Sequence, residues 1–191
     1  MICVFIGKKG SGKSALCRKL VYLRLTSPGL RPLVLYHDPK GNIAPDAGRS
    51  FGSVESARAE WEANQTLPQL SVFRGRNVNL DKLAELALDV GHCTLVFDEL
   101  DRCFSGKSFR YQNVERVFHE GRNDKVDLFG TFRAPRNVSE DVIGQSDWCF
   151  LFRFNANAYW DLDQIKRRFG PHYSERVQEI EPFQFVVWAD R

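Results

Sequence analysis

Short apolar runs along the chain are separated by longer segments in which apolar residues recur at helical spacing. Short continuous apolar runs are typical of buried parallel strands, whereas apolar residues at helical spacing are typical of helices that bury one face. The runs predict strands over residues 2–6, 32–36, 70–73, 93–97, 126–131, 148–152 and 183–188. The periodic segments predict helices over residues 14–23, 53–64, 81–90, 109–120 and 158–169. This alternation predicts an α/β fold with a mostly parallel central sheet and helices on both faces.

The length of the chain, 191 residues, fits one domain with a sizeable core. We expect a single domain over residues 1–191, with a core over about 1–155 and a helix–strand extension over about 156–191. No window holds the roughly 18 consecutive apolar residues that a membrane span needs. The N-terminal run 1–6 is too short for the apolar core of a signal peptide. The sequence therefore predicts no membrane span.

Composition and charge exclude two function classes and favour one compartment. The formal net charge of +3 argues against a strongly basic nucleic-acid coat and against an acidic tail. The charge is uneven, with +7 over residues 1–40, −5 over 41–101, +4 over 102–136 and −3 over 137–191. The five cysteines are widely spaced and form no CxxC pair, which argues against a zinc site and fits a reducing cytoplasm.

The strongest chemical signal is the segment Gly7–Ser14, GKKGSGKS, which matches the P-loop pattern G-x-x-x-x-G-K-[ST] between a predicted strand and a predicted helix. Its glycines let backbone N–H groups surround phosphate oxygens, and the helix N-terminus adds positive potential. Lys13 is expected to reach the β- and γ-phosphates of ATP, and the Ser14 hydroxyl to ligate Mg²⁺. The expected nucleotide-binding residues are Gly7, Lys8, Lys9, Gly10, Ser11, Gly12, Lys13, Ser14 and Ala15. A second Gly-Lys-Ser at 106–108 has no preceding strand and is expected to be a polar loop.

A second signal is the apolar run Thr94–Phe97 followed by Asp98 and Glu99, which matches a Walker B strand. At the carboxyl edge of a parallel sheet, Asp98 would face the same crevice as the P-loop and hold Mg²⁺ through a water molecule. Glu99 would polarise a water for attack on the γ-phosphate. Two solvated acids at a strand end are the alternative explanation. The catalytic glutamate favours hydrolysis over a kinase reaction, because a kinase substrate supplies its own nucleophile.

The motifs together resemble the HerA/FtsK branch of P-loop ATPases, and most closely the small genome-packaging ATPases of membrane-containing viruses. The resemblance covers about residues 1–155 and includes the additional-strand, catalytic-glutamate type of P-loop fold. It rests on Gly7–Ser14, Tyr36–Asn42, Thr94–Phe104, His119–Asn123 and Val126–Arg136. The resemblance implies a Mg²⁺-dependent ATPase that forms a homo-oligomeric ring and moves double-stranded DNA. It further implies a capsid or portal-vertex partner and a place in the host cytoplasm, with association with the virion as a further option.

The resemblance also assigns roles to individual residues. A ring of this kind places an arginine of one subunit in the nucleotide site of its neighbour, and Arg122 is the candidate, with Arg133 and Arg136 as substitutes. An exposed helix-end arginine or a structural ion pair is the alternative for Arg122. Relatives often carry a glutamine as a γ-phosphate sensor where this chain has Phe132, so Thr131 or Arg133 would take that role.

Two questions stay open at the level of sequence. Lys107 and Arg110, beyond the Walker B strand, are candidates for sequence-independent contact with DNA phosphates, and a solvated loop is the alternative. A small-molecule or nucleotide kinase shares the P-loop but would need an arginine-rich lid, which we do not find. A phage assembly or extrusion ATPase of the zonula-occludens-toxin type shares the core, but that family implies a transmembrane segment after it, and none precedes Arg191.

Overall fold

The computed structural model of the protein describes residues 1–27, 33–41 and 48–189. The expected helix end at Pro28 and Gly29, the expected strand start at Pro32, and Asn42 lie outside these described residues.

The centre of the molecule is an eight-stranded sheet in the order β10-β9-β1-β8-β5-β2-β4-β3. Its strands are β1 (Ile2–Ile6), β2 (Leu33–Asp38), β3 (Arg49–Phe51), β4 (Leu70–Arg74), β5 (Cys93–Phe97), β8 (Asp127–Phe132), β9 (Trp148–Phe152) and β10 (Phe185–Ala189). All neighbouring strands run parallel except β10, which pairs antiparallel with β9. The fold class expected from the sequence is therefore confirmed.

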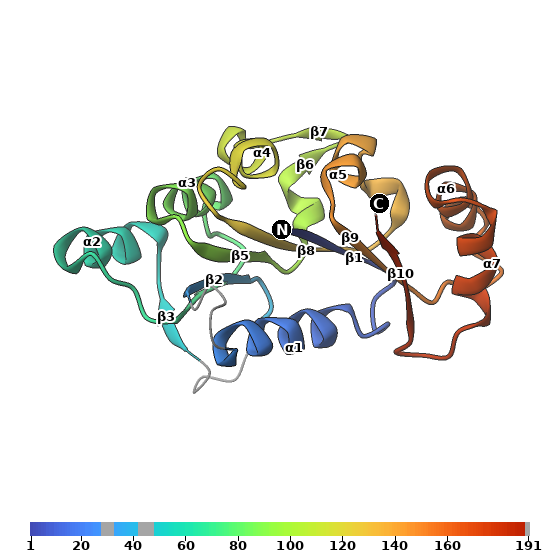
Figure 1. Ribbon diagram of the computed structural model, residues 1–191, viewed down its shortest axis with the longest axis horizontal. Helices are drawn as coiled ribbons and strands as arrows, with labels where there is room; N and C mark the ends of the chain where they lie inside the picture. Colours follow the sequence, from blue (N-terminus) through green and yellow to red (C-terminus); the bar gives the residue numbers. More distant parts are fainter. Residues whose placement is uncertain (28–32, 42–47, 190–191) are drawn as a thin grey trace.

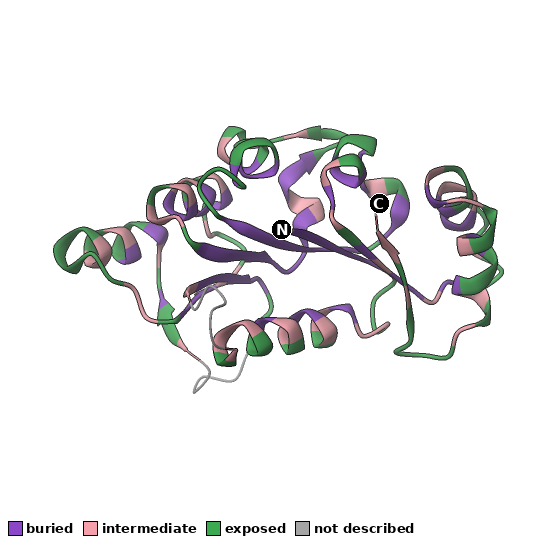
Figure 2. Ribbon diagram, viewed as in Figure 1, coloured by how far each residue is buried: buried purple, intermediate pink, exposed green. Residues whose placement is uncertain are grey.

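Helices cover both faces of this sheet. They are α1 (Lys13–Thr26), α2 (Val54–Asn64), α3 (Leu80–Val90), α4 (Gln112–Glu120), α5 (Glu140–Gln145), α6 (Tyr159–Phe169) and α7 (Pro171–Glu179). Figure 1 shows α1 on one face, α3, α4 and α5 on the other, α2 near the β3 edge, and α6 and α7 near the β10 edge. The central strands are buried between these layers (Figure 2). None of the helices in the described part of the chain is long and apolar enough to cross a bilayer.

The position of β8 matters most for function. It lies between β1, which leads into the P-loop, and β5, which ends at Asp98 and Glu99. This is the additional-strand arrangement expected from the resemblance. Because all three strands are parallel, their carboxyl ends meet at one edge of the sheet, where α/β proteins bind ligands.

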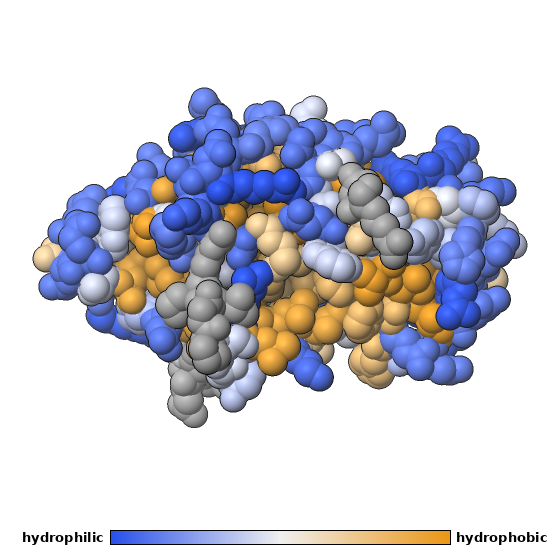
Figure 3. Space-filling model, viewed as in Figure 1, coloured by the Kyte–Doolittle hydropathy of each residue, from blue (hydrophilic) through white to orange (hydrophobic). Residues whose placement is uncertain are grey.

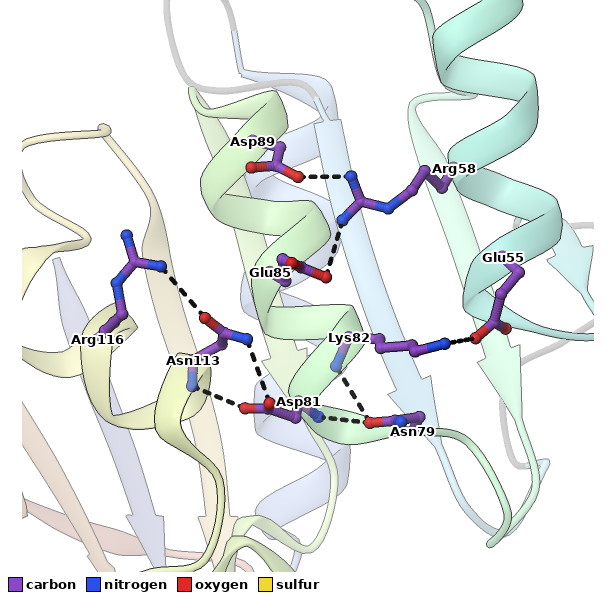
Figure 4. A network of polar contacts seen from close by, with 9 residues as sticks. All are labelled: Glu55, Arg58, Asn79, Asp81, Lys82, Glu85, Asp89, Asn113 and Arg116. Atoms are coloured by element: carbon purple, nitrogen blue, oxygen red, sulfur yellow. Dashed lines mark hydrogen bonds and ion pairs between the residues drawn. The ribbon is translucent and has the colours of Figure 1, made fainter.

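Polar contacts join the three helices α2, α3 and α4. Arg58 of α2 pairs with Glu85 at 3.2 Å and with Asp89 at 2.5 Å, both on α3. Asp81, at the start of α3, accepts hydrogen bonds from the backbone N and the Nδ2 of Asn113 on α4, at 2.7 and 3.2 Å. Figure 4 shows these contacts as two neighbouring groups, one around Arg58 and one around Asp81, which together join three helices. Most of these side chains are partly exposed, so we expect each pair to contribute less than about 1 kcal/mol to stability.

The structure differs from the expected elements at two places. Phe109, expected to begin a helix, instead lies in β7 (Ser108–Phe109), which pairs with β6 (Phe104–Ser105) in a hairpin. Gly106 has a left-handed φ of +64° that permits the tight turn between them, and the ring of Phe109 packs on Phe104. The helix α4 therefore begins only at Gln112, and the expected polar loop at 106–108 consists of the hairpin turn at Gly106 and Lys107 and the first residue of β7.

The second difference lies near the end of the chain. The expected last strand includes Phe183, but β10 begins at Phe185 and Phe183 lies in a turn with a left-handed φ of +70°. The sequence pattern also does not predict β3, α5, α7 and two short 3-10 helices, at Leu100–Cys103 and Pro135–Asn137.

Some apolar side chains of α1, β9 and β10 remain exposed at the surface. In Figure 3 a group of apolar residues is visible on the α1 side of the sheet. Leu23 on α1, Trp148 on β9 and Val187 on β10 are 46%, 43% and 38% exposed, and they line one shallow groove.

The close contact between Gly130 and Leu100 helps to position the segment that follows β5, and a substitution can test this. A Cβ built on Gly130 in β8 would lie 2.2 Å from Cδ2 of Leu100, directly after Glu99. We expect Gly130→Ala to destabilise the protein by about 1–3 kcal/mol through overpacking. The free energy of unfolding from urea denaturation measures this effect. Combining it with Leu100→Ala should cost less than the sum of the two single changes, and additive costs would contradict this explanation.

Candidate active site

The P-loop connects β1 to α1 and leaves the helix N-terminus open. Gly10 and Gly12 have left-handed φ values of +81° and +100°, which glycine adopts at low cost. Among the described residues no side chain caps α1, and its first turn contains no acidic residue. Free backbone N–H groups and the positive end of the helix dipole therefore face the loop, which is an arrangement suited to an anion.

Lys13 lies at the start of α1 with its side chain folded over the loop. Its Nζ donates a hydrogen bond to the carbonyl oxygen of Lys8 at 2.8 Å, and the residue is 8% exposed. Burial lowers the pKa of the Lys13 ammonium to about 8, although the nearby Asp98 carboxylate acts in the opposite direction. The neighbouring carboxylate thus compensates only part of the cost of burying the ammonium, which would gain from a bound phosphate.

Asp98 forms the centre of a small hydroxyl–carboxylate cluster. Its Oδ1 accepts hydrogen bonds from Ser14 Oγ and Thr131 Oγ1, both at 2.9 Å, and the residue is 2% exposed. Hydroxyl and carboxylate oxygens are the ligands that Mg²⁺ prefers. Within the described residues no group of three or more His, Cys, Asp or Glu side chains could hold a metal alone. The donor set fits a magnesium ion that takes its other ligands from water and phosphate, as Mg²⁺ usually does.

Glu99 is held from both its backbone and its side chain. Its φ of +78° is unusual for a non-glycine residue, a conformation that costs about 1–3 kcal/mol, and its N–H donates to Thr131 Oγ1 at 2.9 Å. The carboxylate forms ion pairs with Lys40 Nζ at 2.7 Å and with the Arg133 guanidinium. Burial raises the pKa of Glu99, but the hydrogen bonds from Lys40 and Arg133 outweigh burial and hold the pKa below its usual value. Glu99 is therefore a carboxylate at neutral pH.

These groups line one pocket of about 460 Å³ at the carboxyl edge of the sheet. Its lining residues are Lys9, Gly10, Gly12, Lys13, Ser14, Ala15, Arg18, Lys40, Arg76, Asp98, Glu99, Thr131, Arg133 and Phe183. Six cationic side chains thus surround two carboxylates, a balance that favours a polyphosphate.

The structure brings most of the expected site residues together. Of the expected residues, Gly7, Lys8 and Ser11 belong to the same loop but are not among the residues that line the pocket. Gly7 lies beneath the loop, where a Cβ would come within 2.7 Å of Phe152 Cβ. The Gly7 N–H donates to the Phe132 carbonyl at 3.1 Å, which anchors the loop to the end of β8.

The two sensor candidates have different environments. Thr131 is 2% exposed and hydrogen-bonds to Asp98 and to the Glu99 backbone, so it positions the acidic pair. Arg133 has a half-exposed side chain that lines the pocket and pairs with Glu99. Phe132 belongs to the apolar core, where its ring packs on Phe104. A polar sensor at position 132 is therefore replaced by a core residue, and Arg133 is the better placed candidate.

The candidate trans arginine lies at the other edge of the sheet from the pocket of its own chain. Arg122 pairs with Asp147 at 2.9 Å, just before β9, and its side chain is 56% exposed. This is the amino-terminal edge of the parallel strands, whereas the P-loop lies at the carboxyl edge. Arg136 follows β8 and pairs with Asp161 at 3.6 Å, with a 60% exposed side chain.

The two DNA candidates lie on the hairpin that follows the Walker B strand. Lys107 occupies the turn between β6 and β7 and is exposed, and Arg110 follows β7 and is also exposed. The backbone N–H of Arg110 donates to the Cys103 carbonyl at 2.8 Å, which fixes the base of the hairpin. Lys107 also lines a cavity of about 580 Å³ together with Arg167 and Arg168 of α6.

Lys40, Arg76 and Phe183 line the pocket without a site role assigned to them from the sequence. Lys40 follows β2, and it reaches Glu99 because β2 and β5 are neighbours in the sheet. Strand order is a tertiary property that the sequence does not state. The one sequence feature that indicates a role for Lys40 is its position in the Asp-Pro segment after the second predicted strand. Phe183 follows the end of the P-loop at Ser14 by 169 residues, and no sequence signal links the two.

The lowered pKa of Lys13 predicts a pH dependence of nucleotide binding. Below about pH 8 Lys13 is charged before the nucleotide binds, whereas above it binding must first take up a proton. We expect affinity for ATP to fall above about pH 8 by up to tenfold per pH unit. Titration calorimetry from pH 6.5 to 9.5 measures the affinity and the proton uptake. Lys13→Arg should flatten the profile because arginine keeps its charge, and an unchanged slope in that variant would contradict the assignment.

Comparison with known proteins adds structural neighbours. No protein-family model and no curated protein sequence matches this chain. The genome packaging NTPase B204 from Sulfolobus turreted icosahedral virus 2, in complex with ATPγS, superposes with a TM-score of 0.79 at 18% identity, covering 98% of this chain and 91% of that chain. B204 from Sulfolobus turreted icosahedral virus, called a DNA-packaging ATPase, gives a TM-score of 0.69 at 20% identity, with 98% and 91% coverage.

A third neighbour belongs to the alternative considered from the sequence. The N-terminal domain of zonular occludens toxin from Neisseria meningitidis gives a TM-score of 0.51 at 14% identity, covering 82% of this chain and 78% of that chain. The viral enzymes match over almost the whole chain. The chain therefore has the P-loop NTPase fold of the viral genome-packaging ATPases.

Proposed function

We propose that this protein is a Mg²⁺-dependent ATP hydrolase that couples turnover to the movement of double-stranded DNA, as a viral genome-packaging motor. One observation carries the proposal. Asp98, which hydrogen-bonds to the P-loop serine, and Glu99, the next residue, line the same pocket as Lys13. This arrangement supplies a phosphate cradle, a metal site and a water-activating carboxylate within one cavity.

Each group of pocket residues would have its own role in ATP hydrolysis. The open N-terminus of α1 and the Lys13 ammonium would bind the phosphates of ATP. Ser14 and Asp98 would hold Mg²⁺, whose charge offsets the negative charge of the phosphates when it is bound. Glu99 accepts a proton or a hydrogen bond from water and orients that water for in-line attack.

The ion pairs of Glu99 suggest how the site avoids premature water activation. Lys40 and Arg133 pair with the Glu99 carboxylate and hold its pKa low, which makes it a weak base. Both cations line the pocket, so a γ-phosphate would compete with Glu99 for them. Their transfer to phosphate would free the carboxylate and let its pKa rise. Glu99 would then become an effective base only when ATP is present.

A ring of identical subunits is the assembly that we propose, on the strength of Arg122. Its guanidinium lies at the opposite edge of the sheet from its own pocket and is half-exposed. It can serve phosphoryl chemistry only in another molecule, where an arginine supplied in trans stabilises the transferring phosphate. To do so it would have to leave Asp147. Arg136, exposed near the carboxyl edge, is the alternative finger.

DNA is the proposed polymer that the motor moves. The neighbouring viral proteins are called genome- and DNA-packaging enzymes. In this chain the hairpin carries Lys107 and Arg110 on its exposed surface, where they would contact phosphates without reading sequence. A capsid or portal-vertex protein in the host cytoplasm would receive the DNA.

A DNA-stimulated hydrolysis assay tests this function. We expect phosphate release to rise with duplex length and to be insensitive to sequence. Replacing Lys107 and Arg110 with glutamine should weaken DNA affinity. It should also make the negative slope of log K against log salt less steep, by ~0.9 for each lost contact. The control Lys125→Gln should change neither quantity. Transfer of the γ-phosphate to a nucleoside monophosphate, with no hydrolysis, would instead establish a kinase.

A further inference from the structure

The turn before β10 holds an aromatic side chain in a backbone conformation that normally belongs to glycine. Residues Glu181–Gln184 form a β-turn in which the Gln184 N–H donates to the Glu181 carbonyl at 3.1 Å. Pro182 takes the second position and Phe183 the third, with a φ of +70°. Proline followed by a positive φ defines a type II turn, whose third position strongly favours glycine. Phenylalanine there carries a conformational cost that a purely structural turn would not need.

The ring of Phe183 lies over the P-loop rather than in the core. The side chain lines the nucleotide pocket, and Phe183 is 70% exposed. It approaches the loop so closely that a Cβ on Gly12 would lie 3.0 Å from Phe183 Cδ1. A large exposed aromatic on a strained backbone at the mouth of a pocket points to a ligand contact, because burial does not repay the strain.

Strand order places this ring on the side of the P-loop away from the chemistry. The sheet runs β10-β9-β1-β8-β5, and the P-loop follows β1. Asp98 and Glu99 follow β5 and Thr131 lies in β8, on one flank of β1, whereas Phe183 precedes β10 on the other flank. A nucleoside triphosphate with its γ-phosphate at Glu99 would extend across the loop toward Phe183.

We infer that Phe183 forms the base subsite of this pocket, as a stacking surface for the purine of a nucleoside triphosphate. The inference rests on the proposed function and extends it to the part of the substrate that the P-loop does not contact. A phenyl ring offers a flat π-face and no hydrogen bond, so it recognises the base by area and not by its edge. We therefore expect purine nucleotides to bind more tightly than pyrimidine nucleotides.

The test compares ATP with inorganic tripolyphosphate, which lacks the base, by titration calorimetry in the presence of Mg²⁺. Base–aromatic stacking is worth about 1–3 kcal/mol, so Phe183→Ala should weaken ATP about 5- to 150-fold while tripolyphosphate binds as before. Phe183→Trp should retain ATP affinity. Trp160→Ala removes an equally exposed aromatic that lies outside the pocket, and it should change neither affinity.

A second readout separates a base contact from a structural role. Phe183→Gly should keep or raise the midpoint of thermal unfolding, because glycine suits this position of the turn, and should still weaken ATP. A lower midpoint with unchanged ATP affinity would overturn the inference in favour of a structural turn residue. Equal losses for ATP and tripolyphosphate would overturn it as well.

The outcome also distinguishes this inference from the proposed function. If the wild-type protein binds ATP and tripolyphosphate, but Phe183→Ala leaves their ratio of affinities unchanged, only the base subsite is wrong. If the wild-type protein binds neither, the proposed function itself fails and the subsite fails with it.

Discussion

The Glu99→Gln variant is expected to hydrolyse ATP about 10²- to 10⁴-fold more slowly than the wild-type protein, the usual contribution of a positioned general base. Glutamine matches the shape of glutamate but cannot take a proton from water. The backbone N–H of residue 99 would still donate to Thr131, so the strained turn after β5 should persist. Phosphate release under saturating ATP and Mg²⁺ measures the effect.

Binding data make this prediction specific to catalysis. Affinity for ATP should be kept or increased in Glu99→Gln, because Lys40 and Arg133 lose a competing carboxylate and remain available to phosphate. Glu62→Gln, an exposed acid on α2, serves as the matched control and should match the wild-type rate. A Glu99→Gln variant that hydrolyses ATP at the wild-type rate would contradict the assignment of Glu99 as the base.

Asp98→Asn is expected to raise the Mg²⁺ concentration needed for half-maximal hydrolysis by about 10- to 100-fold, as for other residues that orient metal-bound groups. Asparagine keeps an oxygen that can accept from Ser14 and Thr131, but it loses the charge that attracts the cation. Hydrolysis measured against free Mg²⁺ gives this value directly. Chelation with EDTA should stop hydrolysis in the wild-type protein and in the variant.

Asp101→Asn is a matched control for this experiment. Asp101 lies three residues after Asp98, and burial raises the pKa of its carboxyl, but it is not among the residues that line the pocket. Its replacement should leave the Mg²⁺ requirement near that of the wild-type protein. An equal shift in both variants would mean that general electrostatics, and not a metal contact, accounts for the result.

The central strands and the phosphate site are predictable from sequence because their signals are local. The run Ile2–Ile6 is apolar throughout because β1 is buried on both faces, and the glycines of the P-loop are required by the backbone at that point. The β5 run followed by Asp98 and Glu99 is equally local. In each case the residues that create the signal are adjacent in the chain to those that would do the chemistry.

The elements that sequence patterns miss are short or depend on tertiary contacts. Strand β3 has only three residues, and α5 has six, which is too few for a periodic pattern. Phe109 fits a helical pattern, but its pairing with Phe104 in the hairpin overrides that preference. Helix α7 follows α6 after Gly170 and begins at Pro171, and this Gly-Pro pair is typical of the end of a helix, so the sequence gives no sign that a second helix follows.

The same distinction explains the site residues that the sequence does not reveal. Lys40 reaches Glu99 only because β2 lies beside β5, and Phe183 reaches Gly12 only because β10 returns antiparallel beside β9. Both contacts depend on strand order, which apolar periodicity does not encode. A motif therefore locates the phosphates and the water-activating acid, while the three-dimensional structure is needed to find the cations around Glu99 and the candidate base contact.

The most direct test of the motor is displacement of a labelled third strand from a triplex at one end of a linear duplex. The wild-type protein with ATP and Mg²⁺ should displace the third strand, with a delay that grows with the distance to the triplex. Glu99→Gln, which is expected to bind ATP without hydrolysing it, should not displace it. Efficient ATP hydrolysis by the wild-type protein without displacement at any duplex length would contradict the account of this protein as a DNA-translocating motor.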